Sequence, residues 1–344
     1  MKKVITLLLA AGLVIGAASA ANAVDIKAKG LWHNAMSFAD RNFEKHNGSD
    51  KMQNATRIRT QIDVIASESL KGVVYFEIGP QNWGKGADGA SLGTDGKVVK
   101  VRYNYVDWVI PQTDAKVRMG LQNFSLPGFA LPNVILGGGG ADGAGITLSY
   151  QFNDMAGMSL FWMRAENDNT TIDRGVGNAM DFVGLSVPLT GEGWQLNPWG
   201  MYGNLGKNSL NEVGENGESL IVGLLPYGQD GVSVVAKDSN NPAWWLGIGG
   251  ELTTFDPLRL AFDFAYGKAD WGKAANGQDL TRQGWLLSGI AEYKLDHVTP
   301  GLVRLRRQFR YDGRLGTPAH AVSRLGRHDP WLGRRLWDFG RRGA

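Results

Sequence analysis

The sequence predicts an all-β fold, an antiparallel transmembrane β-barrel, and three observations lead to this prediction. Apolar and polar residues alternate with a period of two in many segments, which is typical of strands with one apolar and one polar face. Short turns and long polar loops join these segments alternately, as in a barrel with two unlike rims. Beyond an N-terminal leader, no segment stays apolar for the ~18 residues that a membrane-spanning helix needs.

The N-terminal residues 1–23 have the form of a bacterial secretory signal peptide. Two lysines precede an apolar stretch, and Ala21-Asn22-Ala23 supplies the small residues of a cleavage site. An uncleaved membrane anchor is the alternative, but the apolar stretch is short for that role. We therefore expect the mature chain to begin at Val24, with the barrel in residues 24–300.

The composition disfavours several classes of site. The 344 residues include no cysteine, which excludes disulfides, zinc fingers and thiol nucleophiles. Only five histidines occur, and we expect no catalytic residue, no metal and no cofactor. The segment GGGGADG at 137–143 lacks the Lys-Ser/Thr of a phosphate loop and is interpreted as a flexible loop. Calcium binding through Asp168 and Asp173 stays open as an alternative for one acidic loop.

The segment ATRIRTQIDV at 55–64 illustrates the alternation of the strands. Its apolar side chains are Ile58, Ile62 and Val64, and its charged ones are Arg57, Arg59 and Asp63. In a barrel, the apolar set contacts lipid and the charged set faces a water-filled lumen. A soluble β-sandwich also alternates, but aromatic residues near strand ends favour the girdles of a membrane barrel. These residues are Trp32, Trp83, Trp108, Trp199 and Trp285.

Charged residues recur at the polar positions of the first strands, and we expect them to line a pore. The predicted pore-lining residues are Lys27, Lys29, Arg57, Arg59, Asp63, Glu77, Lys100, Arg102, Lys116 and Arg118. A ladder of basic residues on one wall produces an electrostatic field across the lumen. The alternative is that these charges only keep the lumen hydrated and do not select ions. As a group they predict a bias toward anions.

The segment after the fifth predicted strand, 115–122, is long and unusually apolar for a loop. Residues 123–143 contain two prolines, several glycines and a series of apolar side chains. Such a loop is expected to fold inward against the barrel wall and to narrow the pore. The residues assigned to this constriction loop are Phe124, Leu126, Phe129, Leu131 and Asp142.

Several spaced segments resemble a known family. YFEIGPQNWGKG, YVDWVIPQTDAKVRMGLQ and NPWGMYG, together with the leader followed by VDIKAKG, are similar to the homotrimeric outer-membrane porins of sulfate-reducing deltaproteobacteria. The resemblance extends to about Pro300. It implies a 16-stranded general-diffusion porin in the bacterial outer membrane, with the loop after the fifth strand constricting the channel. The implied partners are two further copies in a homotrimer, outer-membrane lipid and lipopolysaccharide, and small hydrophilic solutes and ions; no nucleic acid is expected.

Three other functions remain as alternatives. A carbohydrate-selective porin requires aromatic residues such as Trp244 and Trp245 to line the lumen, but consecutive residues of a strand face opposite ways. An outer-membrane enzyme requires a Ser/His/Asp set, which the few histidines disfavour. A soluble secreted β-sandwich binding protein would leave the cell envelope without detergent.

The last 44 residues differ in kind from the rest of the chain. Residues 301–344 contain eleven arginines and no lysine, and repeated RLG and GRR segments replace the alternation. About 12 strands are recognisable before residue 300, so the family resemblance leaves about four unaccounted for. We expect that a reading-frame shift produced this segment; a basic tail that binds lipopolysaccharide or peptidoglycan is the alternative.

Overall fold

The strands of the protein form one antiparallel sheet. The computed structural model describes residues 24–39, 51–94, 96, 99–131, 135–136, 141–167, 179–206, 241–273, 279–296 and 299–312. The sheet contains 14 strands, and from β1 to β8 and from β10 to β14 each strand pairs with the next one along the chain. The predicted all-β antiparallel fold class is therefore confirmed. No helix in the described part of the chain has the length and hydropathy of a membrane span.

The strands have the following bounds. They are β1 (Asp25–Ala39), β2 (Lys51–Ser67), β3 (Leu70–Asn82), β4 (Val99–Val109), β5 (Ala115–Phe124), β6 (Ala141–Asn153), β7 (Ala156–Glu166), β8 (Met180–Ser186), β9 (Leu189–Gly191), β10 (Trp194–Leu205), β11 (Asn241–Phe255), β12 (Leu258–Lys273), β13 (Asp279–Tyr293) and β14 (Gly301–Asp312). A single 3-10 turn, η1 (Gly86–Asp88), follows β3 in the described residues.

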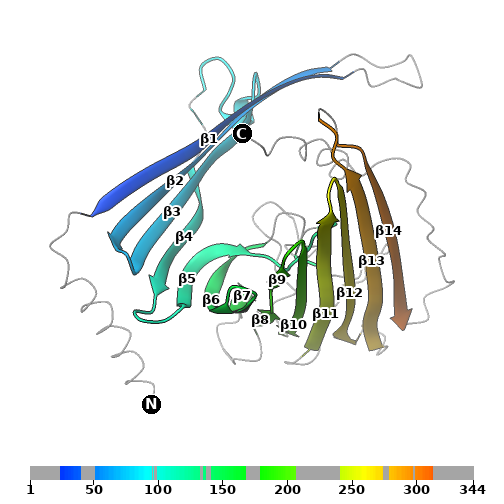
Figure 1. Ribbon diagram of the computed structural model, residues 1–344. Coiled ribbons are helices and arrows are strands. Elements are labelled where there is room, and N and C mark those ends of the chain that lie inside the picture. Colours follow the sequence, from blue (N-terminus) through cyan, green and yellow to red (C-terminus); the bar gives the residue numbers. More distant parts are fainter. Residues whose placement is uncertain are drawn as a thin grey trace, which may run out of the picture.

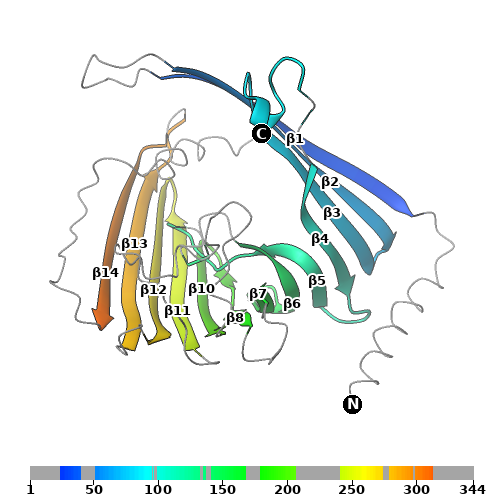
Figure 2. The same ribbon diagram turned by 180° about the vertical axis from the view of Figure 1, so that it is seen from behind.

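The sheet curves into the wall of a barrel. Figures 1 and 2 show β1–β4 on one side and β10–β14 on the other, joined by β5–β9. The segment that follows β5 passes along the concave side of this curve (Figure 1). We call the concave side the inner face and the convex side the outer face. Within the described residues the sheet is open, because β1 and β14 are its two edges.

The short strands β8 and β9 together occupy one position in the sheet. Both pair with β10, and both pair with β7. The interruption falls at Val187 and Pro188, because proline has no N–H to donate to a neighbouring strand. Counted in this way, β1–β13 provide twelve strand positions before residue 300. The number of strands expected from the alternation is therefore met.

Strand β14 extends the sheet beyond the predicted end of the barrel at residue 300. Its twelve residues pair with β13 from Gly301 to Asp312. The register places Arg304 opposite Gly289 and Arg306 opposite Leu287, both on the outer face. Backbone pairing thus incorporates this stretch even though Arg304 and Arg306 lie on the apolar side. Residues 313–344 and the leader 1–23 lie outside the described residues.

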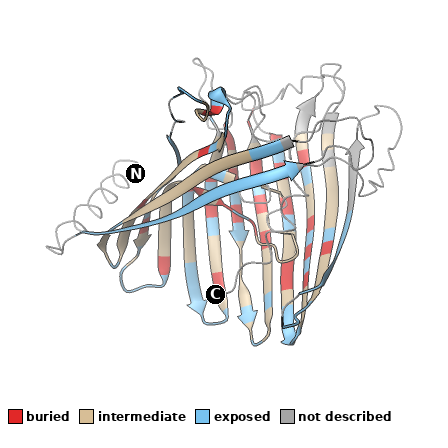
Figure 3. Cartoon of the chain, turned by 90° about the horizontal axis from the view of Figure 1, so that it is seen from above, coloured by how far each residue is buried: buried red, intermediate tan, exposed pale blue. Residues whose placement is uncertain are grey.

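Burial differs between the two ends of the sheet. Figure 3 shows buried residues on the middle and later strands, whereas β1 is exposed along its described length. The buried hydrophobic residues concentrate on the inner face from β5 to β12. Large hydrophobic residues on the outer face remain exposed, for example Trp32 at 64%, Tyr202 at 52% and Phe262 at 39%.

Candidate functional site

The inner face of β1–β5 carries a ladder of charged side chains that runs from strand to strand, and we call it the charged wall. Register pairing aligns Lys27 with Asp63, Arg59 with Glu77 and Glu77 with Lys100. The same face continues to Arg118 on β5, Thr147 on β6 and the buried Phe161 on β7. The strand pairings therefore place nine of the ten predicted pore-lining residues on the inner face: Lys27, Lys29, Arg57, Arg59, Asp63, Glu77, Lys100, Lys116 and Arg118.

Arg102, the tenth of these residues, lies at an irregularity in β4. The register between β3 and β4 shifts here, and the Arg102 guanidinium reaches both Glu77, at 3.4 Å, and Asp142 on β6. Glu77 also receives a hydrogen bond from Nε of Arg59. Two arginines, Arg59 and Arg102, are thus held by two carboxylates, Glu77 and Asp142. This arrangement orients the guanidinium groups and balances their charge.

A second group of ion pairs centres on Asp107, which is buried. Its carboxylate accepts hydrogen bonds from Arg118 at 2.6 and 2.9 Å, and Lys116 lies 3.0 Å away. Lys71 is 3.8 Å from the same carboxylate. Sequence reasoning missed Asp107 and Lys71, although both occupy inner-face positions of the same alternation. One carboxylate among three cations leaves a local excess of positive charge.

Three of the predicted cations have no acidic partner in the part of the chain that the structure describes. Among the described residues, no carboxylate lies within ion-pair distance of Lys29, Arg57 or Lys100. Lys29 and Lys100 are exposed, and Arg57 is half-buried beside His33 of β1. These three cations are therefore the ones that a mobile anion would experience most strongly on the charged wall.

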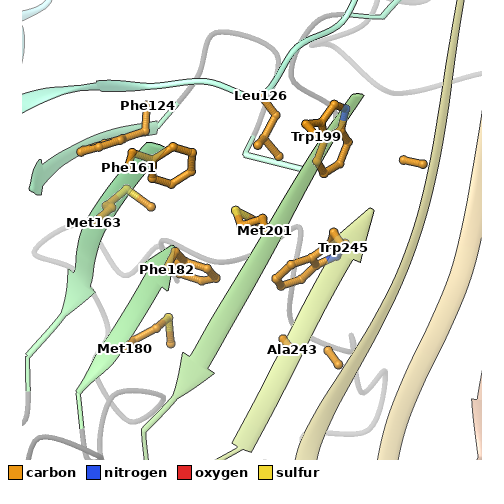
Figure 4. Packing of buried hydrophobic residues seen from close by; sticks show 12 residues of the cluster. Phe124, Leu126, Phe161, Met163, Met180, Phe182, Trp199, Met201, Ala243 and Trp245 are labelled. Atoms are coloured by element: carbon orange, nitrogen blue, oxygen red, sulfur yellow. The ribbon is translucent and has the colours of Figure 1, made fainter. Parts of the chain in front are cut away.

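The opposite part of the inner face is apolar and packed. Its buried cluster consists of Phe124, Leu126, Phe161, Met163, Met180, Phe182, Trp199, Met201, Ala243, Trp245, Ala265 and Ala269. Figure 4 shows Leu126, on the segment after β5, between Phe161 and Trp199. Several of the aromatic rings lie over glycines of the neighbouring strand: Trp199 covers Gly247, and Trp245 covers Gly267. A side chain at either glycine would collide with the ring.

The segment after β5 is attached to the far side of the sheet by Asp263 of β12. The Asp263 carboxylate accepts hydrogen bonds from the backbone N–H groups of Phe129, Ala130 and Leu131, at 2.9, 2.7 and 2.6 Å. Arg259 of the same strand donates to the Phe129 carbonyl oxygen at 3.3 Å. Gly249 on β11 has no side chain, and this leaves room for the Phe129 ring. The segment therefore crosses the concave side from β5 to β12.

The structure revises the boundaries of this segment. Phe124, expected in the loop, is the last residue of β5, and Asp142 belongs to β6. The strands extend further because β5 and β6 stay paired up to Phe124 and Ala141, with Phe124 packed near Gly143 and Gly145. Leu126 is buried, whereas Phe129 and Leu131 are half-buried. Residues 132–134 and 137–140 lie outside the described residues.

Two further sequence expectations need correction. Trp199, expected in an aromatic girdle, is buried on the inner face, because its parity along β10 matches that of Met201. Trp244 lies on the outer face next to Tyr266, with ring centroids 5.4 Å apart, while Trp245 lies on the inner face and is buried in the cluster. Neither tryptophan offers an exposed ring on the inner face.

The other sites considered from the sequence fall mostly outside the described residues. Among them, no group of three or more histidine, aspartate or glutamate side chains could hold a metal ion. Asp168, Asp173 and the glycines at 137–140, which were considered for calcium or phosphate binding, lie outside the described residues.

Comparisons with known proteins give only distant similarities. Searches of protein families and of curated proteins find no match to this sequence. Among solved structures, a porin is 10% identical, with 84% of this chain and 85% of that chain covered and a TM-score of 0.48. The anion-selective porin from Comamonas acidovorans is 13% identical, with coverage of 84% and 80% and a TM-score of 0.45. The outer-membrane expressed OmpT of Vibrio cholerae is 11% identical, with coverage of 83% and 76% and a TM-score of 0.44.

Proposed function

We propose that this protein is a bacterial outer-membrane porin that lets small hydrophilic solutes and ions diffuse passively. One observation carries the proposal: the outer face exposes large hydrophobic residues from β1 to β13, whereas the inner face holds ion pairs. A membrane barrel needs this division, because lipid surrounds its outside and water fills its inside. No reacting group is required for such a function.

The two faces distinguish this function from the soluble alternative. A β-sandwich would cover its apolar face with a second sheet, but every described strand belongs to one sheet. Trp162, Tyr202 and Phe264 stay exposed on the outer face at 38%, 52% and 40%. Exposed apolar surface of this extent indicates contact with lipid or with another protein.

The carbohydrate-selective alternative is less well supported. Sugar recognition by stacking requires aromatic rings that are accessible from the lumen, and Trp245 is buried in the inner-face cluster at 7% exposure. An outer-membrane enzyme with a Ser/His/Asp set is also disfavoured, because the sequence has only five histidines.

The charged wall supports a preference for anions. Basic side chains outnumber acidic ones on the inner face of β1–β5, and Lys29, Arg57 and Lys100 have no acidic partner among the described residues. The segment anchored by Asp263 would restrict the space in front of this wall. Selection would therefore combine size exclusion at this segment with the field of the wall.

The test is conductance of the purified protein in a planar lipid bilayer. We expect discrete current steps in potassium chloride, and a reversal potential under a salt gradient that indicates anion preference. Release of the protein from cell envelopes without detergent, together with an absence of channel activity, would overturn the proposal.

Oligomeric state and lipid contacts are further parts of the proposal. Three barrels associated through their apolar outer faces would form a closed ring of the kind common in homo-oligomers. The outermost lipid contacts would be with lipopolysaccharide. Mass measurement of the detergent-solubilised protein by light scattering tests the trimer.

For residues 301–344, we propose that a reading-frame shift produced the segment. The unusual arginine content supports this, and so does the outer-face position of Arg304 and Arg306. An arginine on the lipid face near the bilayer midplane costs about 2–4 kcal/mol. Resequencing the gene tests the proposal, and an intact frame through Ala344 in a protein that assembles stably would contradict it.

A further inference from the structure

A polar pocket lies on the inner face of β5–β7, below the start of the segment that follows β5. Its volume is about 220 Å³, and Asn123, Phe124 and Ser125 border it at the loop end. Lys116 borders it near the other end, next to the short turn between β4 and β5. The pocket therefore lies between the segment that crosses from β5 to β12, which we call the crossing segment, and the rim of short turns. At about 30 Å³ for each water molecule, it has room for a partly hydrated small ion.

Three polar side chains form a row across the floor of this pocket. Lys116 of β5 pairs with Ser149 of β6, and Ser149 pairs with Ser159 of β7. Side chains directly opposite each other on neighbouring strands have Cβ atoms about 5 Å apart. One ammonium group and two hydroxyl groups thus converge on the same small volume.

The donors in this row are available for a ligand. An ammonium group has three N–H donors, and Lys116 directs one interaction toward Asp107 at 3.0 Å, with its side chain 41% exposed. The hydroxyls of Ser149 and Ser159 make no hydrogen bond to any described residue, whereas their neighbour Thr147 donates to Gln122 at 2.9 Å. Two N–H groups and two O–H groups therefore remain free to bind an acceptor.

The surroundings of the row are rigid and positively charged. Arg118 directs two hydrogen bonds to Asp107, so a single carboxylate faces Arg118, Lys116 and Lys71. Gln122 is buried and donates to the Gly145 carbonyl oxygen at 3.1 Å, which holds the wall behind the row. A positive pocket with unused donors favours an oxygen-rich anion.

We infer that this pocket binds the oxyanion group of a permeating solute, a phosphate or a carboxylate, through Lys116, Ser149 and Ser159. The inference rests on the proposed porin function and names a solute class for it. A bound anion would pause on its way between the crossing segment and the short-turn rim. Permeation of such anions would then saturate with concentration, which simple diffusion does not do.

The experiment measures the block of chloride current by added anions in bilayers that contain the purified full chain. Inorganic phosphate and acetate are titrated separately at pH 7, and isothermal titration calorimetry of the detergent-solubilised protein measures binding without conduction. We expect a saturable block and a matching heat of binding for at least one anion. Response to phosphate alone identifies a tetrahedral oxyanion site, and response to both identifies a general oxyanion site.

Variants separate this site from the rest of the pore. The double variant Ser149→Ala with Ser159→Ala keeps every charge and should weaken anion binding at least tenfold, and Lys116→Met should abolish it. Ser69→Ala, in the turn between β2 and β3, is the matched control and should bind like the unaltered protein. Chloride current that neither anion blocks, together with the absence of a heat of binding, overturns the inference, and so does unaltered binding in the double variant. If the protein conducts but its chloride current is not blocked by either anion, the proposed porin function stands and the anion site is excluded. If the protein does not conduct, the porin function is contradicted, and calorimetry alone tests anion binding to the pocket.

Discussion

The backbone N–H of Leu131 donates a 2.6 Å hydrogen bond to the carboxylate of Asp263, 132 residues further along the chain. Phe129 and Ala130 donate to the same carboxylate. A carboxylate that accepts several backbone N–H groups is a strong and directional acceptor. Asp263 therefore fixes the position of a segment whose other end is attached to β5.

Replacement of Asp263 should loosen this segment. Asp263→Ala leaves three N–H groups without their acceptor, and we expect a loss of about 1–3 kcal/mol in the free energy of segment docking. Single-channel recordings should show larger current fluctuations, and Asp263→Asn should have an intermediate effect. Asp256→Ala, in the turn between β11 and β12, is the control. Equal current noise in both alanine variants would contradict the anchoring role.

Reversal of the charge at Arg57 should shift ion preference toward cations. Arg57→Glu changes two charge units, and over about 8 Å of water this is worth roughly 1 kcal/mol, or about fivefold in the permeability ratio. The reversal potential under a salt gradient measures it. Arg59→Glu is a less clean variant because it would place a carboxylate beside Glu77. An unchanged reversal potential for Arg57→Glu would exclude this residue from the ion pathway.

Charge on the outer face should destabilise the inserted barrel. Ile58 pairs with Trp32 and Ile78 on that face, and Ile58→Arg should cost about 2–4 kcal/mol of unfolding free energy near the bilayer midplane. Gln61→Arg, three residues along the same strand but on the inner face, should cost little. Urea unfolding in lipid vesicles measures both, and equal losses would show that the assignment of the two faces is wrong.

The glycines beneath the inner-face aromatic rings should not tolerate a methyl group. Gly247→Ala would drive the new Cβ into the Trp199 ring, and overpacking of this kind costs about 1–3 kcal/mol. Gly72→Ala is the matched strand control, since its nearest neighbour is the Val64 carbonyl oxygen at 4.0 Å. Thermal unfolding of the two variants provides the comparison, and equal midpoints would count against the tight ring–glycine packing.

Much of the fold was predictable because period-two alternation reports directly on the two faces of a strand. In β2, the same alternation separates Ile58 and Ile62 from Arg57 and Arg59. Boundaries were less predictable where small residues let a strand continue, as at Ala141 and Asp142 of β6. Alternation also cannot distinguish an aromatic residue that contacts lipid from one that packs over an inner-face glycine, and Trp199 was therefore misplaced.

The candidate site was predictable only in part. The basic residues of the charged wall follow from the alternation, but the alternation does not show which carboxylate pairs with which basic residue. Asp107 and Asp263 are isolated acidic residues in otherwise ordinary strands. Their partners come from other strands or from a distant segment, so only the folded arrangement identifies them.

The segment after β5 and its anchor, Asp263 on β12, lie far apart in the sequence, and this separation determines the order of two folding steps. Residues 129–131 find their acceptor only on β12, so the entropic cost of closing a loop of this length is not offset until that strand is in place. The segment must therefore dock after β5–β12 have assembled side by side. In the proposed porin, narrowing of the passage would for this reason be a late step of folding, and a wall that has not yet reached β12 would enclose a wider opening than the finished one.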